Sequence, residues 1–261
     1  MCVLAHPDDE SLGTGGALAK SAAEGVATYL LTATRGERGR FGDNVNPPGP
    51  DVVGQTREAE LMAAARELGL REVRVLGYPD GALDKADPAG AIARIAGHLR
   101  RVKPHVVITF GPEGAYGHPD HIAISQFTTA AVVCAADPSF DAGSGPPHRV
   151  SKLYYIAWSP RKWSAYQAAL RKLVFTVNGQ ERQAVPWPDW AITTAIDTSA
   201  VWPAVWRAVS CHQSQMSIYQ KLAELSEEHQ RGLWGSQEFY RVFSCVNGGP
   251  SQESDLFEGL R

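Results

Sequence analysis

The sequence has few cysteines and no apolar run long enough to cross a membrane. Its four cysteines, Cys2, Cys134, Cys211 and Cys245, are widely spaced and form no Cys-x-x-Cys pair. Neither a disulfide framework nor a thiolate metal site is therefore expected, and a reducing compartment is the simpler inference. No stretch approaches the ~18–20 apolar residues of a spanning helix, and no basic region followed by an apolar signal core begins the chain. We predict a cytoplasmic protein without a membrane partner.

The chain also lacks an excess of positive charge. It carries 25 Lys and Arg against 28 Asp and Glu, a formal net charge of −3, and has no dense basic cluster. Proteins that bind the nucleic-acid backbone are usually basic, so nucleic acid is not an expected partner. With 44% hydrophobic and 20% charged residues over 261 positions, the chain can bury a large core. Homo-oligomerisation is left open.

Short β-type runs alternate with helical patterns in the first half of the chain. This alternation is typical of right-handed βαβ units that build a parallel sheet. The predicted strands are Met1–Ala5, Val26–Ala33, Glu72–Gly77, His105–Phe110 and Lys152–Ala157. The predicted helices are Gly16–Glu24, Gln55–Leu68, Asp87–Val102 and a segment from His118 to about Cys134. The sequence therefore predicts an α/β fold with a Rossmann-like, mostly parallel sheet and helices on both faces.

After Trp158 the pattern is less regular. Short antiparallel strands are predicted at Phe175–Asn178, Gln183–Val185 and Ala191–Ile196. Helices are predicted at Val201–Ser210 and Ile218–Glu228. We interpret residues 1–158 as the catalytic core and residues 159–261 as a small C-terminal mixed cap with helices that complete the same domain.

Two segments do not fit a minimal scheme of strands and helices. Gly36–Gly54 is too long and too rich in Gly and Pro for a plain connection, so it is either a substrate loop or a disordered one. Asp137–His148 is interpreted as a surface excursion. The first strand is very short, so the native chain is expected to begin a few residues upstream.

A histidine and three acidic residues follow the first predicted strand, in the stretch His6-Pro7-Asp8-Asp9-Glu10. Taken alone, this stretch could be a polar turn, because Pro and Asp favour turns and Asp9 could cap the following helix. It could equally be half of a metal site. A second cluster decides between the two.

The second cluster is Tyr116-Gly-His118-Pro-Asp120-His121, after the fourth predicted strand. His118 and His121 are spaced i, i+3 at a helix N-terminus, so both imidazoles can project from one face. In the common doubly wound order 3-2-1-4-5 the fourth strand lies beside the first, and ligands collect outside the carboxyl ends of both. The two clusters are therefore predicted to face each other.

Imidazoles with carboxylates, and no thiolate, suit a divalent metal. Zinc is the commonest choice for three protein ligands and one open position, although iron can occupy the same nitrogen and oxygen ligands. The clusters hold more candidate groups than three ligands require. A carboxylate outside the metal's ligand set could take a proton from water, and an imidazole outside it could stabilise a developing oxyanion.

These residues resemble the successive motifs of the LmbE-like/PIG-L zinc-dependent N-deacetylases. The resemblance spans about residues 1–125 in order. Its motifs are Ala5-His-Pro-Asp-Asp-Glu10, Thr32–Gly39 (TATRGERG), Arg57-Glu58, Leu68-Gly69 and Gly117-His-Pro-Asp-His121. Weaker matches follow at His212-Gln-Ser-Gln215 and Glu238-Phe239. The resemblance implies a Rossmann-like fold and removal of an acyl group, usually acetyl, from the amine of a glucosamine-containing substrate.

Position by position, the resemblance implies that His6, Asp9 and His121 bind one zinc ion per chain. It makes Asp8 the general base that activates water. It makes His118 the imidazole that helps to stabilise the tetrahedral oxyanion.

Two further catalytic candidates come from the same motif. Asp120 is expected to orient or charge-stabilise a catalytic histidine, most plausibly His118. Tyr116 matches a family tyrosine near the oxyanion, although a packing aromatic beside a glycine turn is an equally good interpretation.

Arg57 and Asp80 correspond to family positions that touch sugar hydroxyls, so both are candidates for substrate binding. Each has a simpler interpretation. Arg57 could pair with Glu58 or Glu60 on a solvated helix face, and Asp80 lies in a common turn sequence. His212 is more often a packing histidine. Trp187-Pro-Asp-Trp190 could form a wall of the pocket.

We therefore expect a zinc-dependent hydrolase of a small N-acylated amino sugar. One alternative is an amidase for a thiol–sugar conjugate, and another is a metal- or carbohydrate-binding protein without turnover. A Rossmann-type nucleotide-binding protein is a third, because Gly13-Thr-Gly15-Gly16 lies near the first βα turn. Its glycine spacing departs from GxGxxG, and the acidic cluster before it would repel a pyrophosphate.

Overall fold

The computed structural model describes residues 1–44, 46–143, 145–170, 174–177, 179–249 and 251–261. A seven-stranded sheet forms the centre, in the order β3-β2-β1-β4-β5-β9-β8. Its strands are β1 (Cys2–Leu4), β2 (Tyr29–Thr34), β3 (Glu72–Tyr78), β4 (Val106–Phe110), β5 (Lys152–Ile156), β8 (Thr194–Asp197) and β9 (Ser236–Ser244). The first five strands pair in parallel, whereas β9 is antiparallel to both β5 and β8. The predicted mostly parallel sheet and the order 3-2-1-4-5 are confirmed.

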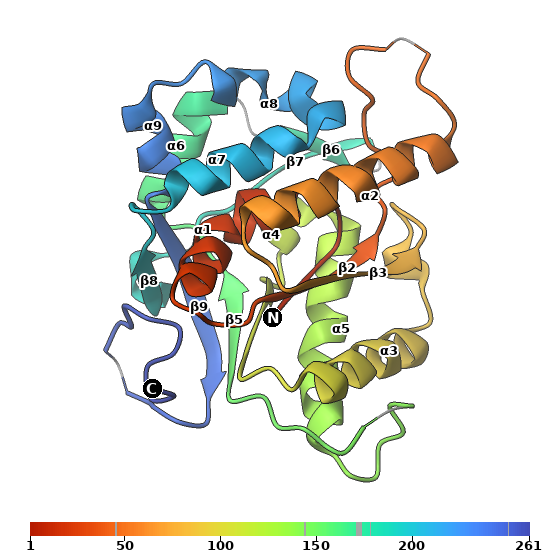
Figure 1. The fold of residues 1–261 in the computed structure, drawn as a ribbon, viewed down its shortest axis with the longest axis vertical. Coiled ribbons are helices and arrows are strands. Elements are labelled where there is room, and N and C mark those ends of the chain that lie inside the picture. Colours follow the sequence, from red (N-terminus) through yellow and green to blue (C-terminus); the bar gives the residue numbers. More distant parts are fainter. Residues whose placement is uncertain (45, 144, 171–173, 178, 250) are drawn as a thin grey trace.

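Helices cover both faces of this sheet (Figure 1). Three pack together on one face: α1 (Asp9–Ala23), α2 (Pro50–Glu67) and α7 (Trp202–Cys211). Two cover the other: α3 (Pro88–Val102) and α5 (Pro119–Ala136), which follows the short α4 (Gly114–Gly117). The C-terminal half adds α6 (Pro160–Leu170), α8 (Met216–Ala223), α9 (Glu227–Trp234) and a separate hairpin of β6 (Val174–Val177) and β7 (Gln180–Gln183). Short 3₁₀ turns lie at Leu83–Lys85, Asp189–Ala191 and Gln213–Gln215.

The central strands are buried because helices cover them from both sides. Every residue of β1 and β4 is buried, which matches the continuous apolar runs expected of an internal parallel strand. β1 pairs with β2 and β4, so the chain segments that follow β1 and β4 emerge side by side. This adjacency places the two predicted clusters at one edge of the sheet.

The first helix begins at Asp9, well before the predicted Gly16. Its glycines make the pattern resemble a loop, but they permit close packing against the C-terminal half. A Cβ on Gly16 would lie 2.8 Å from Thr198, and one on Gly15 would lie 3.0 Å from Val205. These glycines therefore lie inside a helix, where they do not form a phosphate-binding turn, and the nucleotide-binding interpretation loses its support.

The C-terminal half completes the main sheet. β8 and β9 extend the sheet beyond β5, and Figure 1 shows α2 and α7 side by side although they are far apart in the sequence. The predicted helix Ile218–Glu228 is two helices, because Ser226 caps α9 by accepting from the backbone N–H of His229. Of the predicted strand Phe175–Asn178, residue 178 lies outside the described residues. The division of the chain at residue 158 stays a prediction.

Two expectations about composition can be compared with the structure. All four cysteines are free thiols, as predicted. Within the described residues, no helix is long and apolar enough to cross a membrane.

Candidate active site

A cavity of about 450 Å³ opens where β1 and β4 end. Its floor carries side chains from the loop after β1, from α4 and from the start of α5, including His6, Asp8, Asp9, His118 and His121. Arg57, Asp80 and Tyr116 also line it. The structure thus brings together at one cavity all the predicted site residues except Asp120, which lies directly behind His6. A cavity of this size is typical of small-molecule sites.

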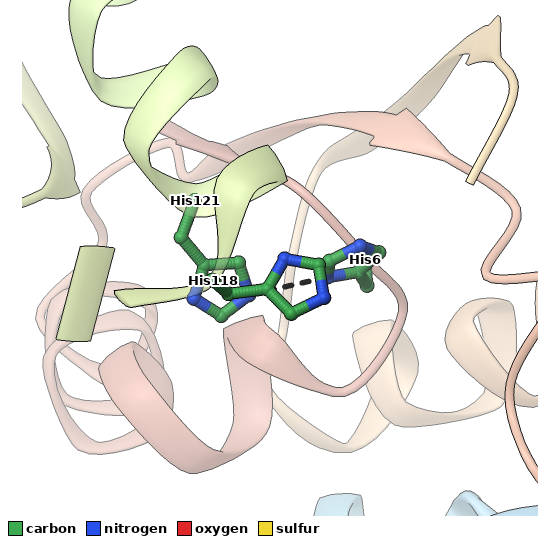
Figure 2. A group of neighbouring side chains, drawn as sticks. All are labelled: His6, His118 and His121. Atoms are coloured by element: carbon green, nitrogen blue, oxygen red, sulfur yellow. Dashed lines mark hydrogen bonds between the residues drawn. The ribbon is translucent and has the colours of Figure 1, made fainter. Parts of the chain in front are cut away.

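His6, Asp9 and His121 have the spacing of metal ligands. His6 Nδ1 lies 3.2 Å from His121 Nε2 and 3.7 Å from Asp9 Oδ2. His121 Nε2 lies 3.5 Å from Asp9 Oδ1. Atoms bound to one tetrahedral zinc at about 2.0–2.2 Å lie roughly 3.4 Å apart, which is close to these distances, although His6 and His121 approach different oxygens of Asp9. Among the described residues, two other groups have ligand atoms within 4.8 Å of one another: His6, His118 and His121, and His6, Asp80 and Asp120. The ligand set His6, Asp9 and His121 therefore stays a prediction. Figure 2 shows the imidazoles of His6 and His121, with that of His118, converging from two different segments.

The far nitrogen of His6 is fixed by two carboxylates. Its Nε2 lies 3.1 Å from Asp80 Oδ1 and 3.2 Å from Asp120 Oδ2. Burial disfavours the charged imidazole, but hydrogen bonds to Asp120 and Asp80 raise the pKa of His6 to about 10. A metal bound at Nδ1 would displace the proton from that nitrogen, and the N–H group at Nε2 would still donate to the two carboxylates. Carboxylates behind a ligating histidine commonly set its orientation in this way.

Asp120 therefore contacts a different histidine from the one expected. Its carboxylate accepts hydrogen bonds from the backbone N–H groups of Gly81, at 2.7 Å, and Leu83, at 3.0 Å, besides its contact with His6. Its hydrogen bonds therefore hold His6. Burial lowers the pKa of His118, and the negative charge of Asp120 opposes this, while the backbone N–H of Asp120 donates to His118 Nδ1. The expected role of Asp120 toward His118 stays a prediction.

One nitrogen of His118 accepts a hydrogen bond from its own helix, which leaves the other nitrogen, Nε2, as a donor. It caps α5, and its Nδ1 accepts a hydrogen bond from the backbone N–H of Asp120 at 3.2 Å. Burial and the nearby charge of His6 lower the pKa of His118, so the neutral ring is favoured. Because Nδ1 is the acceptor, the neutral ring carries its proton on Nε2. This N–H group can donate to a developing negative charge.

Asp8 has a strained backbone, and its two carboxylate oxygens differ in the hydrogen bonds that they accept. Its φ of 100° lies in the left-handed region, which costs a non-glycine residue about 1–3 kcal/mol. Its Oδ2 accepts hydrogen bonds from Arg57 Nη2 and from the hydroxyl of Tyr219, both at 2.9 Å. Within the described part of the chain no hydrogen bond reaches Oδ1. Strain held by surrounding contacts is common at functional residues.

Arg57 is buried and faces the site. Besides Asp8, its guanidinium donates to the backbone oxygens of Pro7, at 2.6 Å, and Gly36, at 2.7 Å. The simpler interpretation of an exposed Arg57 pair is wrong, because Glu58 pairs with Arg35 instead. Glu60 also has another partner, since it accepts hydrogen bonds from Ser214.

Tyr116 lies over the two histidines of α5. Its ring centroid is 5.3 Å from that of His121 and 5.9 Å from that of His118, both edge to face. The preceding Ala115 has a φ of 62°, and Arg182 of the β6–β7 hairpin donates to the backbone oxygen of Gly117 at 2.9 Å. This loop therefore has a defined shape that holds Tyr116 against the cavity.

The C-terminal half contributes a wall of the cavity that the sequence did not place correctly. Trp158, Trp163 and Tyr166 line it, with the Trp158 and Tyr166 rings stacked at 4.8 Å. The suggested wall of Trp187 and Trp190 is not this one. Trp187 donates to Glu113 at 3.1 Å outside the main cavity, and Trp190 is 84% exposed.

An ion pair missed by sequence reasoning ties the two halves together. His212 Nε2 lies 2.8 Å from Glu10 Oε1, and both side chains are fully buried. The other oxygen of Glu10 accepts from the backbone N–H of Asp8 at 2.9 Å. Burial opposes the charge on Glu10, but His212 lowers the pKa of this carboxyl overall. The weak family match at His212–Gln215 is the sequence signal that could have led to this contact.

We expect His212→Ala to lower the free energy of unfolding by about 3–5 kcal/mol, because it leaves the Glu10 carboxylate buried and unpaired. Urea denaturation of the purified protein measures this. The exposed His105 provides the control, and His105→Ala should change stability by less than about 0.5 kcal/mol. Equal stability of the two variants would contradict the ion pair.

A family model and several known proteins resemble this chain. The family model PIG-L, GlcNAc-PI de-N-acetylase, matches residues 1–132. A 1D-myo-inositol 2-acetamido-2-deoxy-alpha-D-glucopyranoside deacetylase from Kineococcus radiotolerans is 36% identical, covering 99% of this chain and 82% of that protein.

Two solved structures share the fold. The conserved protein TT1542 from Thermus thermophilus has a TM-score of 0.65 and 29% identity, covering 95% of this chain and 96% of that one. The 4-carboxy-2-hydroxymuconate hydratase of Pseudomonas putida has a TM-score of 0.71 and 21% identity, covering 95% of this chain and 98% of that one. The second likeness concerns the fold alone. From the family model and the 36% identical relative, this chain belongs to the PIG-L (LmbE-like) family of metal-dependent de-N-acetylases.

Proposed function

We propose that this protein is a zinc-dependent hydrolase that removes the acetyl group from the amine of a glucosamine-containing small molecule. The observation that carries the proposal is the meeting of three groups in one cavity. These are a metal-ligand triad, a carboxylate oxygen of Asp8 without a hydrogen-bond partner among the described residues, and an N–H donor of His118. The name of the Kineococcus relative supports the amino-sugar substrate.

The donor set fits zinc. His6 Nδ1, Asp9 and His121 Nε2 are a nitrogen and oxygen set without thiolate, and burial lowers the pKa of His121, which favours the neutral, ligating imidazole. When bound there, zinc would act as a Lewis acid that polarises the amide carbonyl and acidifies water. Iron could occupy the same ligands.

The chain's own residues supply the proton transfers. Asp8 Oδ1 takes the proton of the attacking water, and His118 Nε2–H donates a hydrogen bond to the carbonyl oxygen as it gains negative charge. The proton then passes to the nitrogen of the leaving amine as the carbon–nitrogen bond breaks. Tyr116, above His118, is proposed as a further group near that oxygen.

Arg57 and Asp80 are proposed to act on the substrate from the cavity wall. Their charged groups also have inner contacts, since Arg57 holds Asp8 and Asp80 holds His6. Their replacement is therefore expected to affect turnover as well as substrate binding. We propose a cytoplasmic location.

The proposal is tested by metal analysis of anaerobically purified protein together with amine release from a panel of substrates. The panel contains N-acetylglucosamine, its inositol glycoside and an acylated thiol–sugar conjugate. Acetate and free amine from the acetylated sugars support the deacetylase. Cleavage of the conjugate alone would favour the amidase alternative, and no amine from any member would refute both.

A further inference from the structure

We propose that Tyr219, on α8, is a positioning residue that holds the general base Asp8 with its Oδ1 toward the reacting water. This inference rests on the proposed function. It adds to the site a group from beyond residues 1–132, the part of the chain that the family model matches.

The hydrogen bonds to Asp8 define the role of Tyr219. The hydroxyl of Tyr219 and Nη2 of Arg57 both lie 2.9 Å from the same oxygen, Oδ2 of Asp8. Two donors on one oxygen fix both the plane and the rotation of the carboxylate. Burial, and then the charge of Asp8, raise the pKa of Tyr219 well above its usual value, so its hydroxyl keeps the proton that it donates. Oδ1 is left as the oxygen that accepts a proton.

Tyr219 is itself held in place by bonds at the start of its helix. Ser214, just before α8, donates to Glu60 of α2 through both its backbone N–H and its hydroxyl, each at 2.7 Å. Gln215 donates to the backbone oxygen of Arg40 at 2.6 Å. One set of bonds runs to α2, which also carries Arg57, so α8 is placed relative to the guanidinium that holds Asp8. Tyr219 also lines the cavity.

The reaction needs an Asp8 carboxylate that does not rotate. If Oδ2 lost one of its two donors, the side chain could turn and expose either oxygen, and fewer substrate complexes would have the base aligned. Arg57 gives Asp8 a single hydrogen bond, through Nη2, and its guanidinium is also held by the backbone oxygens of Pro7 and Gly36. Alignment of the base affects the chemical step more than it affects binding of the sugar.

The test is Tyr219→Phe, which removes only the hydroxyl. We expect kcat to fall about tenfold to a hundredfold, with KM within about twofold of the wild type and zinc content per chain unchanged. The matched control is Tyr155→Phe. Tyr155 is also partly buried and its hydroxyl contacts Thr129 at 2.9 Å, but it lies outside the cavity, so its variant should keep the wild-type kcat.

A double-mutant cycle separates positioning from general structure. In an Asp8→Asn background, Tyr219→Phe should lower the residual rate by less than about twofold, because the group that it positions is gone. An equal loss in both backgrounds, or a wild-type kcat in Tyr219→Phe, would overturn the inference while the proposed function stands. If the wild-type protein releases no amine, the proposed function fails and the inference fails with it. A loss of zinc in Tyr219→Phe would instead assign the residue a structural role.

Discussion

Asp8→Asn is expected to lower kcat by roughly 10²–10⁴-fold while the protein keeps its metal. The amide of Asn has the shape of the carboxylate and can still accept hydrogen bonds from Arg57 and Tyr219 through one oxygen. It cannot take a proton at the position of Oδ1. His6, Asp9 and His121 are untouched, so metal content should match that of the wild type. Steady-state amine release and elemental analysis of the same sample measure the two effects.

The matched control for this variant is Asp51→Asn. Asp51 is an exposed carboxylate in the first turn of α2, outside the cavity. The same loss of charge there should leave kcat within about twofold of the wild type, because surface substitutions have small effects. Full activity of Asp8→Asn would refute the assignment of Asp8 as the base. Loss of metal from it would move Asp8 into the ligand set.

The placement of the two motifs could be predicted because it depends on topology. Once the first five strands have the order 3-2-1-4-5, β1 and β4 must be neighbours, and the segments after them must meet. His6 and His121 are then brought together with no knowledge of side-chain positions. The resemblance assigned roles to these residues, and those roles stay predictions.

The contribution of the C-terminal half could not be predicted, because its contacts are non-local and polar. β9 has no apolar alternation: Gln237 and Glu238 are both buried and form hydrogen bonds to Ala17 and Ser159. A strand that satisfies buried polar groups in this way has the sequence pattern of a loop. Tyr219 likewise gives no sequence signal, since its role depends on where α8 packs.

The histidine that Asp120 contacts was also beyond sequence reasoning. Asp120 is adjacent to His118 in the first turn of α5, which favours a local pairing. The helix instead directs its carboxylate toward the turn after β3, where the backbone N–H groups of Gly81 and Leu83 reach it together with His6. Proximity in sequence did not predict the contact with His6, because the three donors come from elsewhere in the chain.

His121→Ala is expected to lower zinc affinity by more than about 100-fold and to abolish measurable turnover. His121 is 2% exposed, its ring stacks on Phe110 at 3.9 Å, and its Nε2 faces both His6 and Asp9. The proposed ligand atom is Nε2, so removing this side chain removes one of the three proposed ligands. Zinc retained after dialysis against a weak chelator, and amine release, are the measurements.

Comparing His121→Ala with His118→Ala distinguishes the proposed ligand set from one that contains His118. Among the described residues, His6, His118 and His121 lie close enough to form a three-histidine site, and His6, Asp80 and Asp120 form another such group, so distance alone does not select the ligand set. The hydrogen bond from Asp120 N–H to Nδ1 of His118 commits that nitrogen, and the remaining Nε2–H is a donor and not a metal ligand. His118→Ala should therefore keep its zinc and lower kcat by about 10²–10³-fold, as expected for loss of one oxyanion donor. Loss of zinc from His118→Ala, with zinc retained in an Asp9→Ala variant, would replace Asp9 by His118 in the ligand set and leave the developing oxyanion without its proposed donor.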